Sequence, residues 1–225
     1  MAGHSVDDYL ETIYFLAFPI GEYTPRAGAL PLASRVAEML GVSRASAGEM
    51  LKRLEADGLI ERGARKEALL TEAGRERAEQ VVRRHRIIER LLTDFMGYTP
   101  AEAHVHADEL GGTFSDDMVQ RMWDRLDRPA RCPHGWPIEP DVEQEENRAL
   151  QALAELEPGA RATIVRLAEH DGDLLHWFYD QGLVPGQELE VRAAEPAADQ
   201  FTVRLNGGEQ AISEKAAAGL FVRPS

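Results

Sequence analysis

Residues 32–63 read LASRVAEMLGVSRASAGEMLKRLEADGLIERG, and this stretch decides the fold. Its apolar residues recur every three or four positions in two blocks, which is the spacing of one buried face on a helix. The two faces consist of Leu32, Val36, Ala37 and Leu40, then Ala47, Met50, Leu51 and Leu54. Gly41 suits the end of the first helix, and Ser43 suits the N-cap of the second. The stretch therefore predicts two helices joined by a short turn.

A pair of short strands is predicted to follow these helices. Leu59–Arg62 and Glu67–Thr71 read as strands around a basic tip. Two helices and a hairpin in this order are typical of a winged helix-turn-helix. An ordinary helical hairpin with a strand pair is the less specific alternative, but the pattern continues without interruption from Leu32 to Thr71.

Helices are predicted on both sides of this unit. Val6–Leu16 has one apolar stripe, and prolines and glycines interrupt the residues after it. Thr71–Phe95 has apolar residues on more than one stripe, which predicts burial against its own domain and against a partner subunit. Further helices are expected to begin near Pro100 and Ser115. The segment Arg128–Glu145 is expected to be irregular, and a helix over Asn147–Leu156 is left open.

The periodicity changes after Gly159. Ala162–Leu167, Glu188–Val191 and Phe201–Leu205 read as strands, and Asn206-Gly207-Gly208 is a strong hairpin signal. Short strands with turns of this kind predict a small β-barrel.

The charge of the chain is unevenly distributed. The net charge is −14, made up of −2 over residues 1–75, −8 over 76–158 and −4 over 159–225. The first of these parts contains a local basic cluster of Arg44, Lys52, Arg53, Arg62, Arg65 and Lys66. A local positive face is sufficient for phosphate contact, but the overall negative charge weakens non-specific DNA binding. DNA binding that requires bound cations would fit this balance.

The remaining composition favours a cytoplasmic protein. No stretch approaches the roughly 18 apolar residues of a membrane helix, and the N-terminus lacks the basic start of a signal peptide. A single cysteine, Cys132, excludes an intrachain disulfide framework. No HExxH motif, nucleophile elbow or phosphate-binding glycine loop occurs, so an enzyme is not expected.

Three predicted helices each carry a pair of candidate metal ligands on one face. The pairs are Asp8 with Glu11, His85 with Glu89, and His104 with Asp108. Residues three or four positions apart lie on the same side of a helix, so three such pairs can enclose a divalent cation. Carboxylates with imidazole suit Mn²⁺ or Fe²⁺, whereas Zn²⁺ more often recruits thiolate. The bland alternatives are an acid in a first helical turn for Asp8 and an exposed basic side chain for His85.

The order of parts resembles the iron- and manganese-dependent repressors of the diphtheria toxin repressor family. The matching stretches are VDDYLETIY (6–14), LGVSRASAGEMLKRLEADGLIER (40–62), TEAGRERA (71–78), RRHRIIERLLTDFMG (83–97) and RCPHGWPIEP (131–140). The tail around LVPGQELEV (183–191) resembles the SH3-like barrel of the ferrous-transport accessory protein FeoA.

The resemblance implies a mainly α fold with a C-terminal β domain. Its expected parts are a winged-helix DNA-binding domain (1–74), a helical dimerisation and metal-binding domain (75–140), a linker (141–158) and an SH3-like FeoA-type barrel (159–225). The expected partners are a second copy of the chain and double-stranded operator DNA, with no membrane.

The resemblance also distributes the ligands between two metal positions. One position matches His85, Glu89 and His104; the other, regulatory position matches Asp8, Glu11 and Asp108, with a possible contribution from His85. The family usually continues to a Glu and a His where this chain has Gly111 and Gly112. Three explanations stay open: completion by water and Glu109, a single composite site, or a helix break that turns His106 inward.

Manganese is the first choice of cation and iron the second. Iron-responsive members of the family have Met and Cys where this chain has Asp8 and Asp108, so these positions resemble the manganese-responsive members. Two further sets of potential ligands are set aside. Cys132 and His134 are interpreted as part of a proline-rich turn. Glu169, His170 and Asp171 fall near where some members of the family reach back to complete the His85 site, but a solvated loop is the preferred interpretation, and a ligand from the barrel is left open.

In this family the start of the second helix of the motif reads DNA. The expected DNA-binding residues are Ser43, Arg44, Ser46 and Glu49 on this helix, and Arg62, Arg65 and Lys66 on the wing. Arg44 is the best candidate for a bidentate contact with a base or a phosphate. The alternative for all seven is a solvated charged face.

The sequence therefore predicts a repressor of metal-uptake genes that binds DNA when its cation is bound. In this prediction the cation draws Asp8 and Glu11 toward the dimerisation helices and fixes the spacing of the recognition helices. A metal-insensitive winged-helix regulator is the main alternative, and a metalloenzyme is the other.

Overall fold

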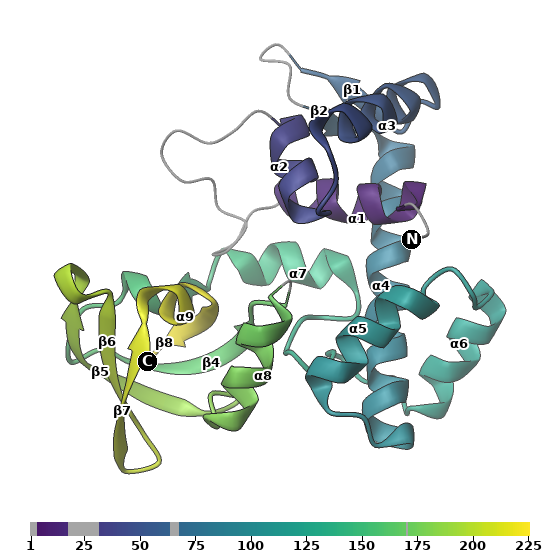
Figure 1. The fold of residues 1–225 in the computed structure, drawn as a ribbon. Helices are drawn as coiled ribbons and strands as arrows, with labels where there is room; N and C mark the ends of the chain where they lie inside the picture. The colour runs from purple at the N-terminus through teal and green to yellow at the C-terminus, as the bar shows by residue number, and fades with distance from the viewer. Residues whose placement is uncertain (1–3, 18–31, 64–67, 170) are drawn as a thin grey trace. The chain divides into compact units, whose positions relative to one another are not determined.

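The computed structural model describes residues 4–17, 32–63, 68–169 and 171–225. The described residues form two compact units, one ending at Val82 and the other beginning at Arg83. Helix α4 (Glu72–Met96) contributes residues to both. Figure 1 shows the order of the elements along the chain.

The first unit is a winged helix-turn-helix, as the sequence predicts. Its elements before α4 are α1 (Val6–Ala17), α2 (Leu32–Met39), α3 (Arg44–Ala56), β1 (Ile60–Arg62) and β2 (Ala68–Leu70). The two strands pair antiparallel, and the predicted N-cap Ser43 accepts a hydrogen bond from the amide of Ser46. Leu10, Leu51 and Leu54 are completely buried, because the apolar stripes of α1 and α3 face the same core.

The second unit begins with helices. After α4 come α5 (Pro100–Leu110), α6 (Asp116–Arg125) and α7 (Pro140–Asn147). Thr99 and Glu102 form a capping box at the start of α5, and Ser115 caps α6. These caps explain why both helices begin where the sequence predicts.

The expectation of irregular chain over Arg128–Glu145 is wrong in one respect. Residues expected to be irregular include the helix α7, whereas the helix left open over Asn147–Leu156 is absent. Those residues form the short strand β3 (Gln151–Ala152) and a 3₁₀ turn, Leu153–Glu155. Pro140 stands in the first turn of α7, where its missing amide costs nothing, so this proline starts a helix rather than preventing one.

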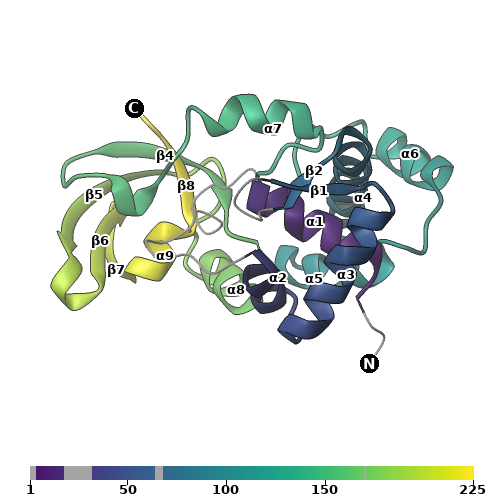
Figure 2. The ribbon, with the colours of Figure 1, turned by 90° about the horizontal axis from the view of Figure 1, so that it is seen from above.

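The C-terminal part is a curved antiparallel sheet with the order β3-β8-β4-β5-β6-β7 (Figure 2). Its other elements are β4 (Arg161–Leu167), α8 (Gly172–Asp180), β5 (Glu188–Glu195), a 3₁₀ turn (Pro196–Ala198), β6 (Gln200–Leu205), β7 (Gly208–Ser213), α9 (Glu214–Ala218) and β8 (Leu220–Pro224). Asn206 and Gly207 both have positive φ, so the predicted hairpin turn joins β6 to β7. The predicted SH3-like domain is confirmed.

Candidate metal centre

Two groups of potential metal ligands lie among the described residues of the second unit. One consists of His85, His104 and Asp108, and the other of Glu89, Cys132, His134 and Glu169. Within each group, the ligand atoms lie within 4.8 Å of one another. We call these the histidine group and the thiol group.

The histidine group is built from α4 and α5. Nδ1 of His85 lies 3.1 Å from Oδ1 of Asp108, and Nε2 of His85 lies 3.1 Å from Nδ1 of His104. Both imidazoles are buried, whereas the side chain of Asp108 is 58% exposed. Asp108 is therefore the member of the group that is most accessible to solvent.

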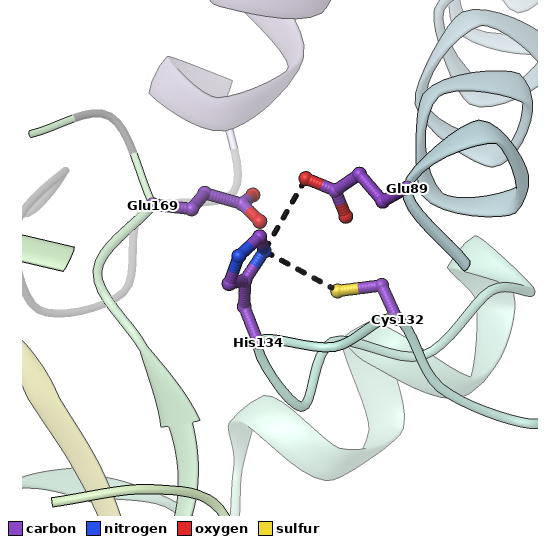
Figure 3. A group of neighbouring side chains, drawn as sticks. All are labelled: Glu89, Cys132, His134 and Glu169. Atoms are coloured by element: carbon purple, nitrogen blue, oxygen red, sulfur yellow. Dashed lines mark hydrogen bonds and ion pairs between the residues drawn. The ribbon is translucent and has the colours of Figure 1, made fainter. Parts of the chain in front are cut away.

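The thiol group is assembled from three separate segments (Figure 3). Glu89 comes from α4, Cys132 and His134 from the turn between α6 and α7, and Glu169 from the residues after β4. All four are buried. Figure 3 shows the carboxylates of Glu89 and Glu169 directed toward the imidazole of His134.

Glu89 connects the two groups. Its Oε1 atom lies 3.0 Å from Nε2 of His85, 2.8 Å from Nδ1 of His104 and 3.2 Å from Nδ1 of His134. The other carboxylate oxygen, Oε2, is buried without a hydrogen-bond partner. A buried carboxylate of this kind needs a compensating positive charge, which protonated imidazoles or a cation can supply.

The hydrogen bonding of His134 determines which nitrogen can bind a metal. Nε2 lies 3.1 Å from the carbonyl oxygen of Pro100. A carbonyl only accepts, so Nε2 donates to it, and Nδ1 is the ring nitrogen that faces Glu89. Metal-binding histidines commonly have their other ring nitrogen fixed in this way.

Gly135 allows the turn with Cys132 and His134 to pack closely on the barrel. Its φ is +90°, and a Cβ at this position would lie 2.0 Å from the carbonyl oxygen of Val165. The amide of Cys132 donates to the carbonyl of Trp136 at 2.8 Å, which closes the turn. The turn therefore lies directly against β4, the strand that leads to Glu169.

The electrostatics of the two groups are strongly coupled. Burial lowers the pKa of His85, but the carboxylates of Glu89 and Asp108 outweigh it and raise the pKa well above its usual value. Burial raises the pKa of Glu89, but the imidazoles of His134 and His85 outweigh it and hold the pKa well below its usual value. Burial, together with the nearby carboxylates, raises the pKa of the Cys132 thiol. The metal-free groups therefore hold ionised Glu89 beside protonated imidazole.

The residues fit a divalent cation. They offer imidazole nitrogens, carboxylate oxygens and one sulfur, the donor types that first-row divalent metals bind. The oxygen of Glu89 that lacks a partner and the fixed ring of His134 are the two observations that favour a ligand role.

The structure brings four of the six predicted metal ligands together. His85, His104 and Asp108 form one group, and Glu89 contacts both of its imidazoles. Asp8 and Glu11 belong to the first unit, so their assignment to a cation with Asp108 stays a prediction.

Asp8 has a local role in the structure. Its carboxylate accepts hydrogen bonds from the backbone amide and from Oγ of Ser5, each at 2.8 Å. These hydrogen bonds cap the start of α1. A capping role is the purely structural alternative to metal binding for an acid in the first turn of a helix.

The glycines at the end of α5 do not turn His106 toward a metal group. Gly111 is the C-cap of the helix, and its carbonyl accepts a hydrogen bond from Arg84. His106 lies against the ring of Tyr98 and pairs with Glu109 at 3.5 Å. Among the residues that the structure describes, neither His106 nor Glu109 is a member of the two groups.

Three members of the thiol group were not predicted to be metal ligands. Cys132 and His134 do form the predicted turn, but both side chains are buried beside Glu89. Glu169 is buried rather than solvated, so that expectation is wrong for this residue. Asp171 caps α8, and His170 lies outside the described residues. The pairing of Cys132 with His134 two positions later was a local signal for this group, and the resemblance to the family pointed to the stretch around Glu169.

The predicted DNA-binding residues on α3 are accessible. Arg44, Ser46 and Glu49 are exposed, and Ser43 is partly used in capping the helix. Arg62 pairs with Glu55 at 3.3 Å. Arg65 and Lys66 lie outside the described residues. In the described part of the chain, no helix has the length and apolar character needed to span a membrane.

Comparisons with known proteins cover the chain from end to end. Residues 1–68 match the family model "Iron dependent repressor, N-terminal DNA binding domain". Residues 71–140 match "Iron dependent repressor, metal binding and dimerisation domain", and residues 151–224 match the FeoA domain.

Individual relatives agree with these matches. The iron-dependent repressor IdeR of Mycobacterium leprae is 33% identical over 87% of this chain and 86% of its own length. A manganese-dependent transcriptional repressor in complex with manganese has a TM-score of 0.85 at 28% identity, covering 98% of this chain and 100% of that one. ScaR with bound Zn²⁺ has a TM-score of 0.81 at 26% identity, covering 98% and 99%.

Proposed function

The chain belongs to the diphtheria toxin repressor family of metal-dependent transcriptional repressors, and from that premise we propose that Mn²⁺ is its activating cation. In this proposal the chain binds operator DNA as a homodimer and represses metal-uptake genes while the cation is bound. The contacts of Glu89 with three imidazoles carry the proposal, because they place a buried carboxylate at the centre of two ligand groups.

The preference for Mn²⁺ rests on the histidine group. Two imidazoles and the carboxylate of Asp108 are oxygen and nitrogen donors, and Asp8 and Glu11 would add two more carboxylates. Such hard and borderline donors suit Mn²⁺, with Fe²⁺ as the second choice. The relatives are named for both iron and manganese, so their names do not decide between the cations.

The thiol group has a different donor set. Cys132 adds a soft sulfur to two carboxylates and an imidazole, which favours Fe²⁺ or Zn²⁺ over Mn²⁺. We therefore assign the regulatory role to the histidine group and Asp8, and a supporting role to the thiol group.

The cation would supply concentrated positive charge among carboxylates that otherwise repel one another. The residues of the chain do the rest: Glu89 and His85 hold the dimerisation helices in one arrangement, and Asp8 and Glu11 tie α1 to that arrangement. The change in DNA affinity is limited by the difference in metal affinity between the free and tied states.

Two surfaces serve the partners. Exposed apolar side chains at the end of α4 and on α5, among them Phe95, Met96 and Val105, are the proposed dimer contact. The exposed start of α3 is the proposed reader of the operator, with Arg44 as its principal contact.

A metal-insensitive regulator is the second candidate. The observation that favours it is Gly111 and Gly112, which stand where the family usually supplies two more ligands. DNA binding would then persist without any cation.

Selection of genomic DNA fragments by the full-length protein separates the two candidates. The selection is run in parallel with Mn²⁺ and with a chelator. Enrichment near metal-transport genes in the Mn²⁺ arm alone supports the metal-dependent repressor. Equal enrichment in both arms contradicts it and supports the metal-insensitive regulator.

A further inference from the structure

A buried cluster of charged and aromatic side chains lies beside the thiol group. Trp136 is completely buried, with the guanidinium of Arg86 5.3 Å and that of Arg166 4.9 Å from its ring centre. Arg86 pairs with Glu143 at 2.7 Å, and Arg166 pairs with Glu146 at 2.6 Å. We call these five residues the Trp136 cluster.

The cluster joins three elements of the second unit. Arg86 comes from α4, Glu143 and Glu146 from α7, and Arg166 from β4. Figures 1 and 2 show α7 lying between α4 and the barrel, as these pairs require. Both arginines and Glu143 are at most 1% exposed, so breaking either pair would leave a buried charge uncompensated.

Both backbone polar groups of Leu167, at the end of β4, form hydrogen bonds with the turn that contains Cys132 and His134. Nε1 of Trp136 donates to the carbonyl of Leu167 at 2.8 Å. The amide of Leu167 donates to the carbonyl of His134 at 3.0 Å. Glu169 follows two residues later, so its backbone position is set by contacts with the residues around Cys132 and His134.

We infer that the Trp136 cluster is a positioning assembly that holds Glu169 of the barrel in place beside Glu89, Cys132 and His134. The inference rests on the thiol group of the proposed function being a metal site. It makes the C-terminal barrel a fixed part of that site, with α7 as the element that holds it there. The five residues of the Trp136 cluster affect the metal site by fixing the position of Glu169, and none of the five is assigned as a metal ligand.

Ordinary stabilisation of the fold is the competing explanation. A merely structural cluster would affect metal binding equally whether or not Glu169 can act as a ligand. If the cluster acts by positioning Glu169, its mutation should not weaken metal binding further once the Glu169 carboxylate is removed. The effects of two mutations on binding free energy do not add when the residues act through each other. A double-mutant cycle distinguishes these two cases.

The cycle combines Trp136→Phe with Glu169→Gln in the full-length chain, titrated with Co²⁺. The absorption of the Co²⁺ complex reports thiolate ligation by Cys132 as well as affinity. Trp136→Phe removes the hydrogen bond to Leu167 and is expected to weaken Co²⁺ binding by about tenfold to a hundredfold, as supporting residues of metal sites do. In the Glu169→Gln background, Trp136→Phe is expected to cause no further loss.

Trp123→Phe is the matched control. Trp123 also donates to a backbone carbonyl, that of Pro129, and has two guanidiniums near its ring, from Arg83 and Arg128. It lies on α6 and does not contact β4 through these bonds. We expect Co²⁺ affinity to be unchanged in this variant.

The outcomes are distinguishable. An equal loss from Trp136→Phe in both backgrounds overturns the positioning role and leaves the ligand assignment intact. No effect of Glu169→Gln on Co²⁺ binding overturns the ligand assignment as well.

A second measurement covers the case in which Trp136→Phe fails to fold. Amide hydrogen exchange over residues 167–169 is compared between the metal-free parent and Arg166→Lys. Faster exchange confined to residues 167–169, with β5 and β6 exchanging as in the parent, supports the positioning role; unchanged exchange, or faster exchange throughout the barrel, contradicts it.

Discussion

Oε1 of Glu89, on α4, lies 2.8 Å from Nδ1 of His104, on α5. The same oxygen also contacts His85 and His134, so this carboxylate belongs to both ligand groups. A substitution of Glu89 should therefore alter cation affinity at either ligand group of the second unit.

Glu89→Gln is expected to lower Mn²⁺ affinity by at least about a hundredfold. Mutation of a residue that only supports a metal ligand typically lowers metal affinity by about 10- to 100-fold, and loss of a ligand itself should lower it at least as much. Isothermal titration calorimetry of the full-length chain measures the change. Asp117→Asn, which removes an exposed carboxylate on α6 outside both groups, should bind Mn²⁺ as the parent does. Unchanged binding by Glu89→Gln would exclude both groups as metal sites.

Cys132→Ser tests the metal preference of the thiol group. Replacing sulfur by oxygen removes the soft donor, so Zn²⁺ affinity should fall by on the order of a hundredfold while Mn²⁺ affinity falls by less than about tenfold. Competition with a chelating dye measures both affinities. Unchanged Zn²⁺ affinity would mean that the thiol is not a ligand.

Asp8→Ala is expected to uncouple DNA binding from Mn²⁺ while the fold and the dimer stay intact. Ser5→Ala is the matched control, since it removes the same helix cap, worth about 1 kcal/mol, but leaves the Asp8 carboxylate in place. Fluorescence anisotropy of operator DNA with and without Mn²⁺ reports the coupling. A normal Mn²⁺ response in Asp8→Ala would place the coupling elsewhere.

Arg44→Ala should weaken operator binding by about 1–3 kcal/mol if the guanidinium contacts a base, and relax sequence preference at one position. If Arg44 contacts a phosphate instead, binding should weaken about uniformly and the salt slope should fall by about one. Arg53→Ala is the control, because Arg53 stands at the other end of α3 and pairs with Asp57. Unchanged operator binding by Arg44→Ala would remove this residue from the proposed interface.

Glu146→Gln tests the charge pairing of α7 through its pH dependence. Burial raises the pKa of Glu146, but Arg131 and Arg166 outweigh it and lower the pKa to about 2. A depressed pKa stabilises the fold above the ordinary glutamate value of 4.5, and this stabilisation is lost as the pH falls toward about 2. The variant should therefore lose about 3 kcal/mol of unfolding free energy at neutral pH, with a smaller difference in acid.

Urea unfolding of the metal-free chain at several pH values measures this difference. Asp117→Asn, which removes an exposed carboxylate paired with Arg121, should change stability little at any pH. A difference between parent and Glu146→Gln that does not shrink in acid would contradict the assignment.

The sequence by itself determined the elements whose signals are local. The apolar spacing around Leu51, the N-cap at Ser43 and the turn at Asn206-Gly207 all act within a few residues of the chain, and the structure contains each as predicted. The pairs His85 with Glu89 and His104 with Asp108 also follow from helical spacing. The two pairs lie close to each other because α4 and α5 pack together.

Only the tertiary structure decided the composition of the thiol group. Its members come from α4, from the turn after α6 and from the end of β4, and no short-range pattern links Cys132 to Glu169. Gly135 permits the close packing that unites them, and the buried pairs of α7 hold the barrel against α4. Local propensity is set by neighbours in the chain, whereas this site depends on long-range packing and charge compensation, which the sequence pattern does not display.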